Sequence, residues 1–137
     1  MDNLTEEQRR KNMQNIRSAG TAAERKIMHE LRRRKIYFAK YVTKLTGKPD
    51  IVFRRKRVVI FIDSDFWHGH PTRCIKPKTN PEYWQNKIAG NRERDKQVNK
   101  ELRRNGWKVI RIWEYNIKHN INRCLRIILN AVAPLKF

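Results

Sequence analysis

The sequence predicts an α/β protein in which a mixed sheet is flanked by helices, in the order α-α-β-β-β-α-β-α. Two short runs of Val, Ile and Phe, at 51–53 and 58–62, are typical of paired strands. Residues 81–104 carry apolar side chains at helical spacing, and residues 107–113 alternate as a strand does. A chain of 137 residues is expected to form one compact domain around this sheet.

The N-terminal part predicts two helices and a strand. Capping-box patterns that start at Thr5 and Thr21 predict helices over 5–17 and 21–35. The first helix is so polar that it buries little by itself, so it is either a frayed basic tail or an arm that becomes ordered on DNA. A strand is expected over 36–42, before the turn that leads to the central strands.

Two carboxylates flank the central strands. Asp50 precedes the first strand and Asp63 ends the second, which is apolar throughout and is expected to be buried on both faces. If residues 54–57 form a hairpin, both carboxylates lie at the same end of the sheet. Mg²⁺ prefers such a pair of hard oxygen ligands, whereas the alternative is two solvated strand-end aspartates. The four basic residues of the hairpin either protect a sheet edge or bind phosphate.

The long helix combines apolar and polar side chains on one face. Asn80 and Pro81 are expected to begin it, and Asn105–Gly106 to end it. Spacings of three and four residues place six side chains on that face: Trp84, Ile88, Asn91, Asp95, Val98 and Leu102. Burial of an unpaired carboxylate is costly, so Asp95 is expected in a structural salt bridge or in a cleft. Residues 117–132 predict a C-terminal packing helix.

The charge of the chain points to a polyanionic partner. Lys and Arg number 33 against 13 Asp and Glu, a formal net charge of +20 that favours nucleic acid. We see no membrane-length apolar run and no secretory signal, and Cys74 and Cys124 form no metal-type pair. These features predict a cytoplasmic protein that works on DNA, with an N-terminal arm at 1–20 and a single domain at 21–137.

The central segment and the long helix together resemble a known family. Pro49-Asp50, a hairpin, and a strand that ends Ile-Asp-x-Asp-Phe-Trp-His-Gly-His are similar to the very short patch repair (Vsr) mismatch endonucleases. The Asn-x-x-x-Asp spacing of Asn91 and Asp95 also matches, and the resemblance runs from about Arg10 to Glu114. This family belongs to the restriction-endonuclease-like group with a PD-(D/E)xK core, which implies that fold and a nuclease domain.

The resemblance implies an active site that uses one or two Mg²⁺ ions. Asp50 matches the aspartate that binds the metal, Asp63 takes the position of the second acid, and the backbone carbonyl of Ile62 is a further ligand. His68 matches the general acid or base, an assignment that suits a group titrating near neutrality. Asp95 then orients His68 or holds a metal-bound water.

The resemblance also implies contacts with mismatched double-stranded DNA. The implied activity is the nicking of one strand beside a T:G mismatch, the product of deaminated 5-methylcytosine. It would be carried out by a monomer in the cytoplasm of a bacterial or archaeal type of cell, with mismatch-repair factors as partners. The expected contacts are of three kinds: apolar wedges in the minor groove, aromatic rings that stack in the major groove, and polar residues of the long helix. The residues are Met13 and Ile16, Phe66 and Trp67, and Asn91 and Arg94, respectively.

The chain departs from the expected patterns in three respects. The family usually has a histidine where this chain has Asp63, and the lysine of the wider nuclease motif is replaced by Asp65. Of the four ligands of a structural zinc site only His70 is kept, so zinc is not expected. These departures leave open a restriction-like nuclease with another specificity. Composition alone also allows a basic nucleic-acid-binding protein without catalysis.

Overall fold

The described part of the chain forms a mixed sheet flanked by helices, as predicted. The computed structural model describes residues 21–65 and 79–132. Its elements follow the chain in this order: α2 (Ala22–Arg33), β1 (Ala39–Lys40), β2 (Ile51–Phe53), β3 (Val58–Asp63), α3 (Pro81–Arg104), β4 (Lys108–Trp113), α4 (Glu114–His119) and α5 (Ile121–Val132). The predicted N-terminal helix lies outside the described residues.

The four strands lie side by side in the order β1-β2-β3-β4. The first three are antiparallel, and the pairing of Ile51 with Ile60 sets the register of the predicted hairpin. β4 runs parallel to β3, with pairs from Val58–Lys108 to Asp63–Trp113. A parallel neighbour needs a crossover connection, and α3 is the helix of that connection.

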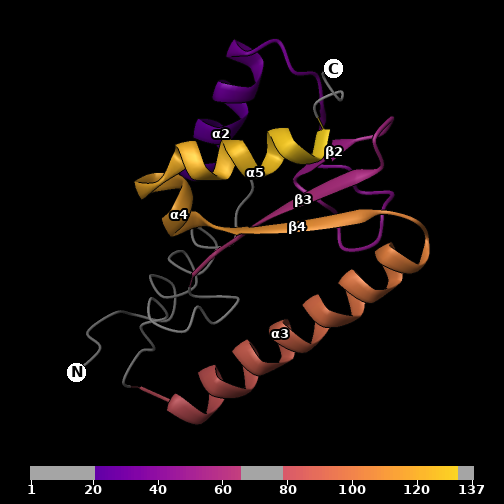
Figure 1. The fold of residues 1–137 in the computed structure, drawn as a ribbon. Helices are drawn as coiled ribbons and strands as arrows, with labels where there is room; N and C mark the ends of the chain where they lie inside the picture. Colours follow the sequence, from indigo (N-terminus) through magenta and orange to yellow (C-terminus); the bar gives the residue numbers. More distant parts are fainter. Residues whose placement is uncertain (1–20, 66–78, 133–137) are drawn as a thin grey trace.

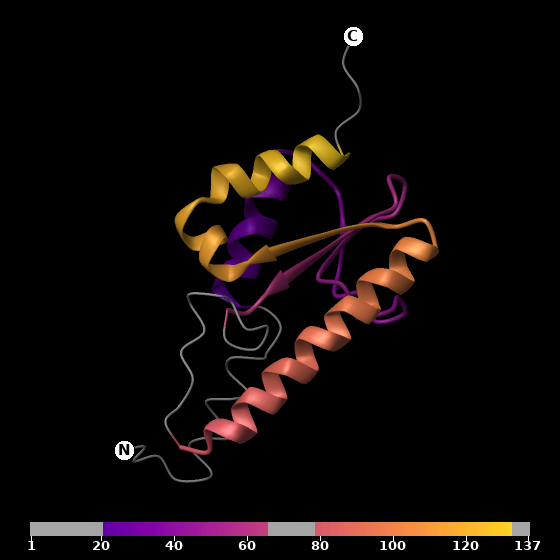
Figure 2. The same cartoon turned by 60° about the horizontal axis from the view of Figure 1, so that its bottom comes forward.

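The helices cover the two faces of the sheet unequally. On one face α2, α4 and α5 pack over a core that includes Ile60, Ile62 and Ile110, whereas α3 crosses the opposite face (Figures 1 and 2). The α3 side has a smaller apolar cluster built on Val59 and Leu102. All six residues of β3 are buried, which confirms that this strand is covered on both faces.

Two predicted elements differ from the observed ones. The strand expected over 36–42 shortens to Ala39–Lys40, because Tyr41 has a positive φ of 51° that ends the regular extended backbone. The C-terminal helix divides into α4 and α5 at Asn120, whose φ of −152° is not helical. The buried side chains are Ile117 in α4 and Cys124, Leu125, Ile128 and Val132 in α5, which fits the predicted packing role.

The ends of the helices follow the capping signals in part. The backbone N–H of Glu24 donates to the Thr21 hydroxyl at 3.3 Å, which confirms the N-cap of α2. Asn80 takes the N-cap position of α3, as predicted, but its side chain makes no cap hydrogen bond and its φ is 54°. Pro81 still occupies the first turn, where its missing N–H has no cost. No helix within 21–65 and 79–132 is both long and apolar enough to cross a membrane.

Candidate active site

The face of the sheet beneath α3 changes from apolar to polar toward the end of β3. Side chains alternate along a strand, so Val59, Phe61 and Asp63 share this face. The parallel register places Arg111 beside Phe61 and Trp113 beside Asp63 on the same face. A carboxylate and a guanidinium therefore lie where the apolar cluster under α3 ends.

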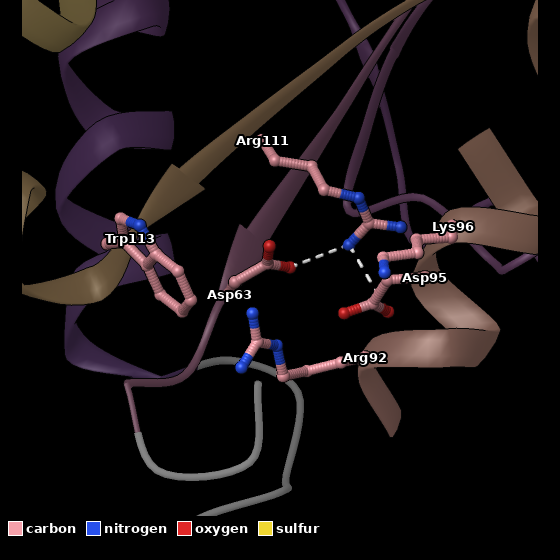
Figure 3. A pocket seen from close by; sticks show the side chains of 6 residues that line it. All are labelled: Asp63, Arg92, Asp95, Lys96, Arg111 and Trp113. Atoms are coloured by element: carbon pink, nitrogen blue, oxygen red, sulfur yellow. Dashed lines mark hydrogen bonds and ion pairs between the residues drawn. The ribbon is translucent and has the colours of Figure 1, made fainter. Parts of the chain in front are cut away.

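A pocket opens between these strands and α3. Its volume is about 200 Å³, and β3, β4 and α3 each contribute to its lining (Figure 3). The six residues that line it are Asp63, Arg92, Asp95, Lys96, Arg111 and Trp113. Three cationic side chains and two carboxylates thus surround one small cavity, an arrangement that suits an anionic ligand together with a cation.

Arg111 lies at the centre of this arrangement. Its Nη1 atom is 2.9 Å from Oδ1 of Asp63 and 3.5 Å from Oδ1 of Asp95, so one guanidinium links β3 to α3 (Figure 3). Its Nε atom donates to Oδ1 of Asn99 at 2.7 Å, and its carbon lies 4.2 Å from the centroid of the Phe61 ring. Because Asp63 is only 5% exposed, this ion pair is largely removed from water.

Asp50 reaches the same end of the sheet from β2. Its N–H donates to the carbonyl of Ile60 at 3.1 Å, and its Oδ2 accepts the N–H of Ile62 at 2.7 Å. Because β2 and β3 are antiparallel, the start of β2 lies at the end of β3 that Asp63 closes. The sequence prediction that Asp50 and Asp63 lie at one end of the sheet is therefore confirmed.

The turn before Asp50 fits closely against α3. Gly47 has a φ of 77°, a conformation that side chains rarely adopt. A Cβ atom at this position would collide with Val98 of α3 and approach the Phe61 ring to 3.2 Å. Glycine therefore suits this point of the turn, three residues before Asp50, where the chain passes close to α3.

The other predicted site residues divide between described and undescribed segments. Asn91 and Asp95 are half-buried on the sheet-facing side of α3, and Arg94 is exposed on the same helix. The salt bridge expected as one alternative for Asp95 is present, with Arg111 as its partner. The remaining predicted contacts and the candidate acid or base lie outside the described residues: Met13, Ile16, Phe66, Trp67, His68 and His70.

The described donors suit a hard cation that is completed by other ligands. Carboxylate oxygens are the donors that Mg²⁺ prefers, and Mg²⁺ commonly uses one or two of them with water and phosphate oxygens. Asp50 and Asp63 provide such a pair. Across 21–65 and 79–132, no cluster of three or more His, Cys, Asp or Glu side chains forms a closed metal site.

Arg111 is the residue that the sequence analysis missed. A signal was available, because an arginine inside the alternating strand 107–113 has to lie on one face of the sheet with Val109 and Trp113. Its partner could not be found without the parallel register of β3 and β4. Arg92 and Lys96 were missed for a different reason: both are exposed, like many basic residues of α3.

A second group of carboxylates lies around Glu114, the first residue of α4. Burial raises the pKa of the Glu114 carboxyl above its ordinary value of 4.5, and repulsion from Asp65 and Glu24 acts in the same direction. Glu24 is itself buried and accepts a hydrogen bond from the Tyr41 hydroxyl at 2.8 Å. These contacts tie α2 to the loop before β2 and to the start of α4.

Comparison with known proteins identifies the family. The family described as "DNA mismatch endonuclease Vsr" matches residues 1–74. The type II nicking enzyme V.NmeDIP of Neisseria meningitidis serogroup C is 36% identical over 134 residues, which cover 96% of this chain and 90% of that protein. The type II nicking enzyme V.NaeI of Lentzea aerocolonigenes is 42% identical, over 78% of this chain and 68% of its own length.

A relative with the family's own name also matches. The DNA mismatch endonuclease Vsr of Escherichia coli is 37% identical over 107 residues, which cover 77% of this chain and 69% of that protein. The mixed sheet flanked by helices and the strand-end carboxylates agree with a restriction-endonuclease-like nuclease. The chain therefore belongs to the Vsr family, and it is a hydrolase that cuts DNA as an endonuclease.

Proposed function

We propose that this endonuclease uses Mg²⁺ to nick one strand of duplex DNA beside a T:G mismatch, in the repair of deaminated 5-methylcytosine. The observation that carries the proposal is that Asp50 and Asp63 lie at the same end of the sheet, where Asp63 lines a pocket with three cationic side chains. The names of the relatives, which are nicking enzymes and a mismatch endonuclease, support the same activity.

In this proposal Asp50, Asp63 and the backbone carbonyl of Ile62 hold the metal. When bound, Mg²⁺ supplies an activated water and neutralises charge that develops on the phosphoryl group. The hydrogen bond from the N–H of Ile62 fixes one oxygen of Asp50, which holds the carboxylate in a single orientation. Preorganised carboxylates of this kind avoid the cost of reorienting ligands during the reaction.

The cationic side chains of the pocket are suited to the scissile phosphate. Arg92 and Lys96 lie one turn apart on α3 and line the pocket next to Asp95. Positive charge at this point attracts a phosphate to the edge of the sheet where the carboxylates lie. His68 is proposed as the general acid or base that exchanges a proton with the attacking water or the leaving oxygen, and Asp95 as the group that orients it.

Recognition of the mismatch is assigned to segments on both sides of the nuclease centre. We propose that residues 1–20 form a DNA-contacting arm and residues 21–137 a single nuclease domain that acts as a monomer. The net charge of +20 supports an extended contact with DNA, and the bacterial relatives support a cytoplasmic location and mismatch-repair factors as partners. The proposed contacts are Met13, Ile16, Phe66, Trp67, Asn91 and Arg94.

Strand cleavage on three duplexes tests the proposal. One carries a T:G pair, and the other two carry T:A or C:G at the same position in the same sequence. We expect Mg²⁺-dependent nicking of the T:G duplex alone, on one strand, and its loss in Asp50→Ala. Equal cutting of all three would refute mismatch specificity and favour a restriction-like nuclease, whereas nicking that persists after removal of all divalent ions would refute the metal assignment.

A further inference from the structure

We infer that Arg111, which lies between Asp63 and Asp95, competes with a divalent ion for Asp63 and weakens its binding. The inference rests on the proposed function, because it takes Asp63 as a metal ligand. It makes Arg111 a positioning residue that sets how tightly the site binds metal.

The contacts of Arg111 support this role. The Nη1 atom lies 2.9 Å from the Asp63 carboxylate, a distance typical of a charge-assisted hydrogen bond. The Asp63 side chain is 8% exposed and that of Arg111 18%, so water screens this pair poorly. The guanidinium therefore offsets part of the charge of a buried carboxylate.

A guanidinium and a divalent ion cannot share Asp63 at low cost. Both carry positive charge, and at this separation from one carboxylate they would repel each other in a poorly screened environment. Arg111 contacts Oδ1 of Asp63, and an ion on either oxygen of this carboxylate would meet its positive charge. This repulsion is subtracted from the affinity for the metal, because the two interactions are linked.

The other contacts of Arg111 show how the exchange can occur without loss of the fold. Its Nε atom donates to Oδ1 of Asn99 in α3, and its guanidinium carbon lies over the ring of Phe61. The contact with Asp95 is longer, at 3.5 Å, and leads away from β3 toward the helix. A small rotation of the guanidinium toward Asp95 would release Asp63 and keep Arg111 anchored at Asn99.

Metal affinity measured without DNA tests the inference. The dissociation constant for Mn²⁺ is determined by calorimetry on the full chain for the wild type, Arg111→Met, Asn99→Ala and Arg126→Met. Arg111→Met removes the competing charge, and Asn99→Ala loosens its anchor without leaving a carboxylate unpaired. Arg126→Met removes the same charge from the exposed side of α5, on the opposite face of the sheet, and serves as the control.

We expect Arg111→Met to bind Mn²⁺ at least about fivefold more tightly than the wild type, the lower end of typical coupling between linked sites. Asn99→Ala should shift affinity in the same direction by less, and it carries the test if Arg111→Met does not fold. The control should match the wild type. Addition of Mn²⁺ should also raise the melting temperature of Arg111→Met more than that of the wild type.

The opposing results separate the two proposals. If the wild type binds Mn²⁺ and both variants bind it equally or more weakly, Arg111 does not compete with the metal, and the proposed nuclease mechanism is unaffected. If neither the wild type nor the variants bind Mn²⁺ and Mg²⁺-dependent nicking is also absent, the metal assignment of Asp63 fails together with the inference.

Discussion

Removal of Arg111 should destabilise the metal-free protein more than removal of both charges of its ion pair with Asp63. Arg111→Met keeps an unbranched side chain at this position but deletes the guanidinium, which lies over the ring of Phe61. It leaves the carboxylate of Asp63, which is 5% exposed, without the cation that lies 2.9 Å away. Asp63→Asn combined with Arg111→Met removes both charges of this ion pair.

The size of the effect follows from burial. Breaking a buried ion pair on one side costs about 3–5 kcal/mol, and partial exposure of Arg111 places this case near about 3 kcal/mol. At roughly 2.1 cal/mol/K of unfolding entropy per residue, that cost lowers the melting temperature by about 10 °C. The double variant should lose less than the sum of the single variants by at least about 1.5 kcal/mol, because residues in contact are coupled.

Urea denaturation followed by circular dichroism, with a chelator present, measures these free energies of unfolding. The four proteins required are the wild type, the two single variants and the double variant. Arg126→Met should fall within about 0.5 kcal/mol of the wild type, as exposed substitutions generally do. If the two single effects add to within about 0.5 kcal/mol of the double variant, the ion pair contributes no coupling and the reasoning is refuted.

Three further changes test the packing and electrostatics around the site. Gly47→Ala should lower the free energy of unfolding by more than about 1 kcal/mol, because φ is positive and the new Cβ meets Val98; a melting temperature equal to that of the wild type would show that the turn adapts. Leu102→Ala should cost about 2–5 kcal/mol in urea denaturation, since this 2% exposed side chain packs α3 on the sheet; a cost below about 0.5 kcal/mol, as for an exposed site, would contradict that packing. Burial raises the pKa of Glu114, so its charged form opposes folding: the penalty is absent below pH 4.5 and complete above the folded-state pKa. Glu114→Gln should therefore raise the melting temperature relative to the wild type at pH 7 and leave it unchanged at pH 4. If the substitution changes the melting temperature equally at both pH values, the assignment is contradicted.

Much of the fold follows from local sequence signals. The continuous apolar run of β3 predicted a strand covered on both faces, and the 3-4 spacing along α3 predicted which side faces the sheet. The positions of Asp50 and Asp63 followed from the same signals, since a short hairpin forces antiparallel pairing. These features depend on neighbours in sequence, and for that reason they were predictable.

The remaining features depend on tertiary contacts. The left-handed conformation of Tyr41 shortens β1, and the break at Asn120 divides the last helix; neither residue type announces such a change. Asp95 was expected either to form a salt bridge or to lie in a cleft, but its partner could not be named from the sequence. The parallel register of β3 and β4 is what brings Arg111 to it. Arginine in a strand could not be assigned to this site by spacing alone.

The most direct test of the account is single-turnover nicking of a T:G duplex by Asp50→Asn. Asparagine can still accept the N–H of Ile62, so the fold is preserved while the charge that would bind metal is lost. The control, Glu93→Gln, removes an equal charge from an exposed position of α3. Loss of several kcal/mol of metal-derived stabilisation predicts that Asp50→Asn nicks at least about 100-fold more slowly than the wild type. DNA binding, measured by fluorescence anisotropy, should stay within a few-fold for both variants. A rate for Asp50→Asn equal to that of Glu93→Gln would contradict the assignment of Asp50 to the nuclease centre.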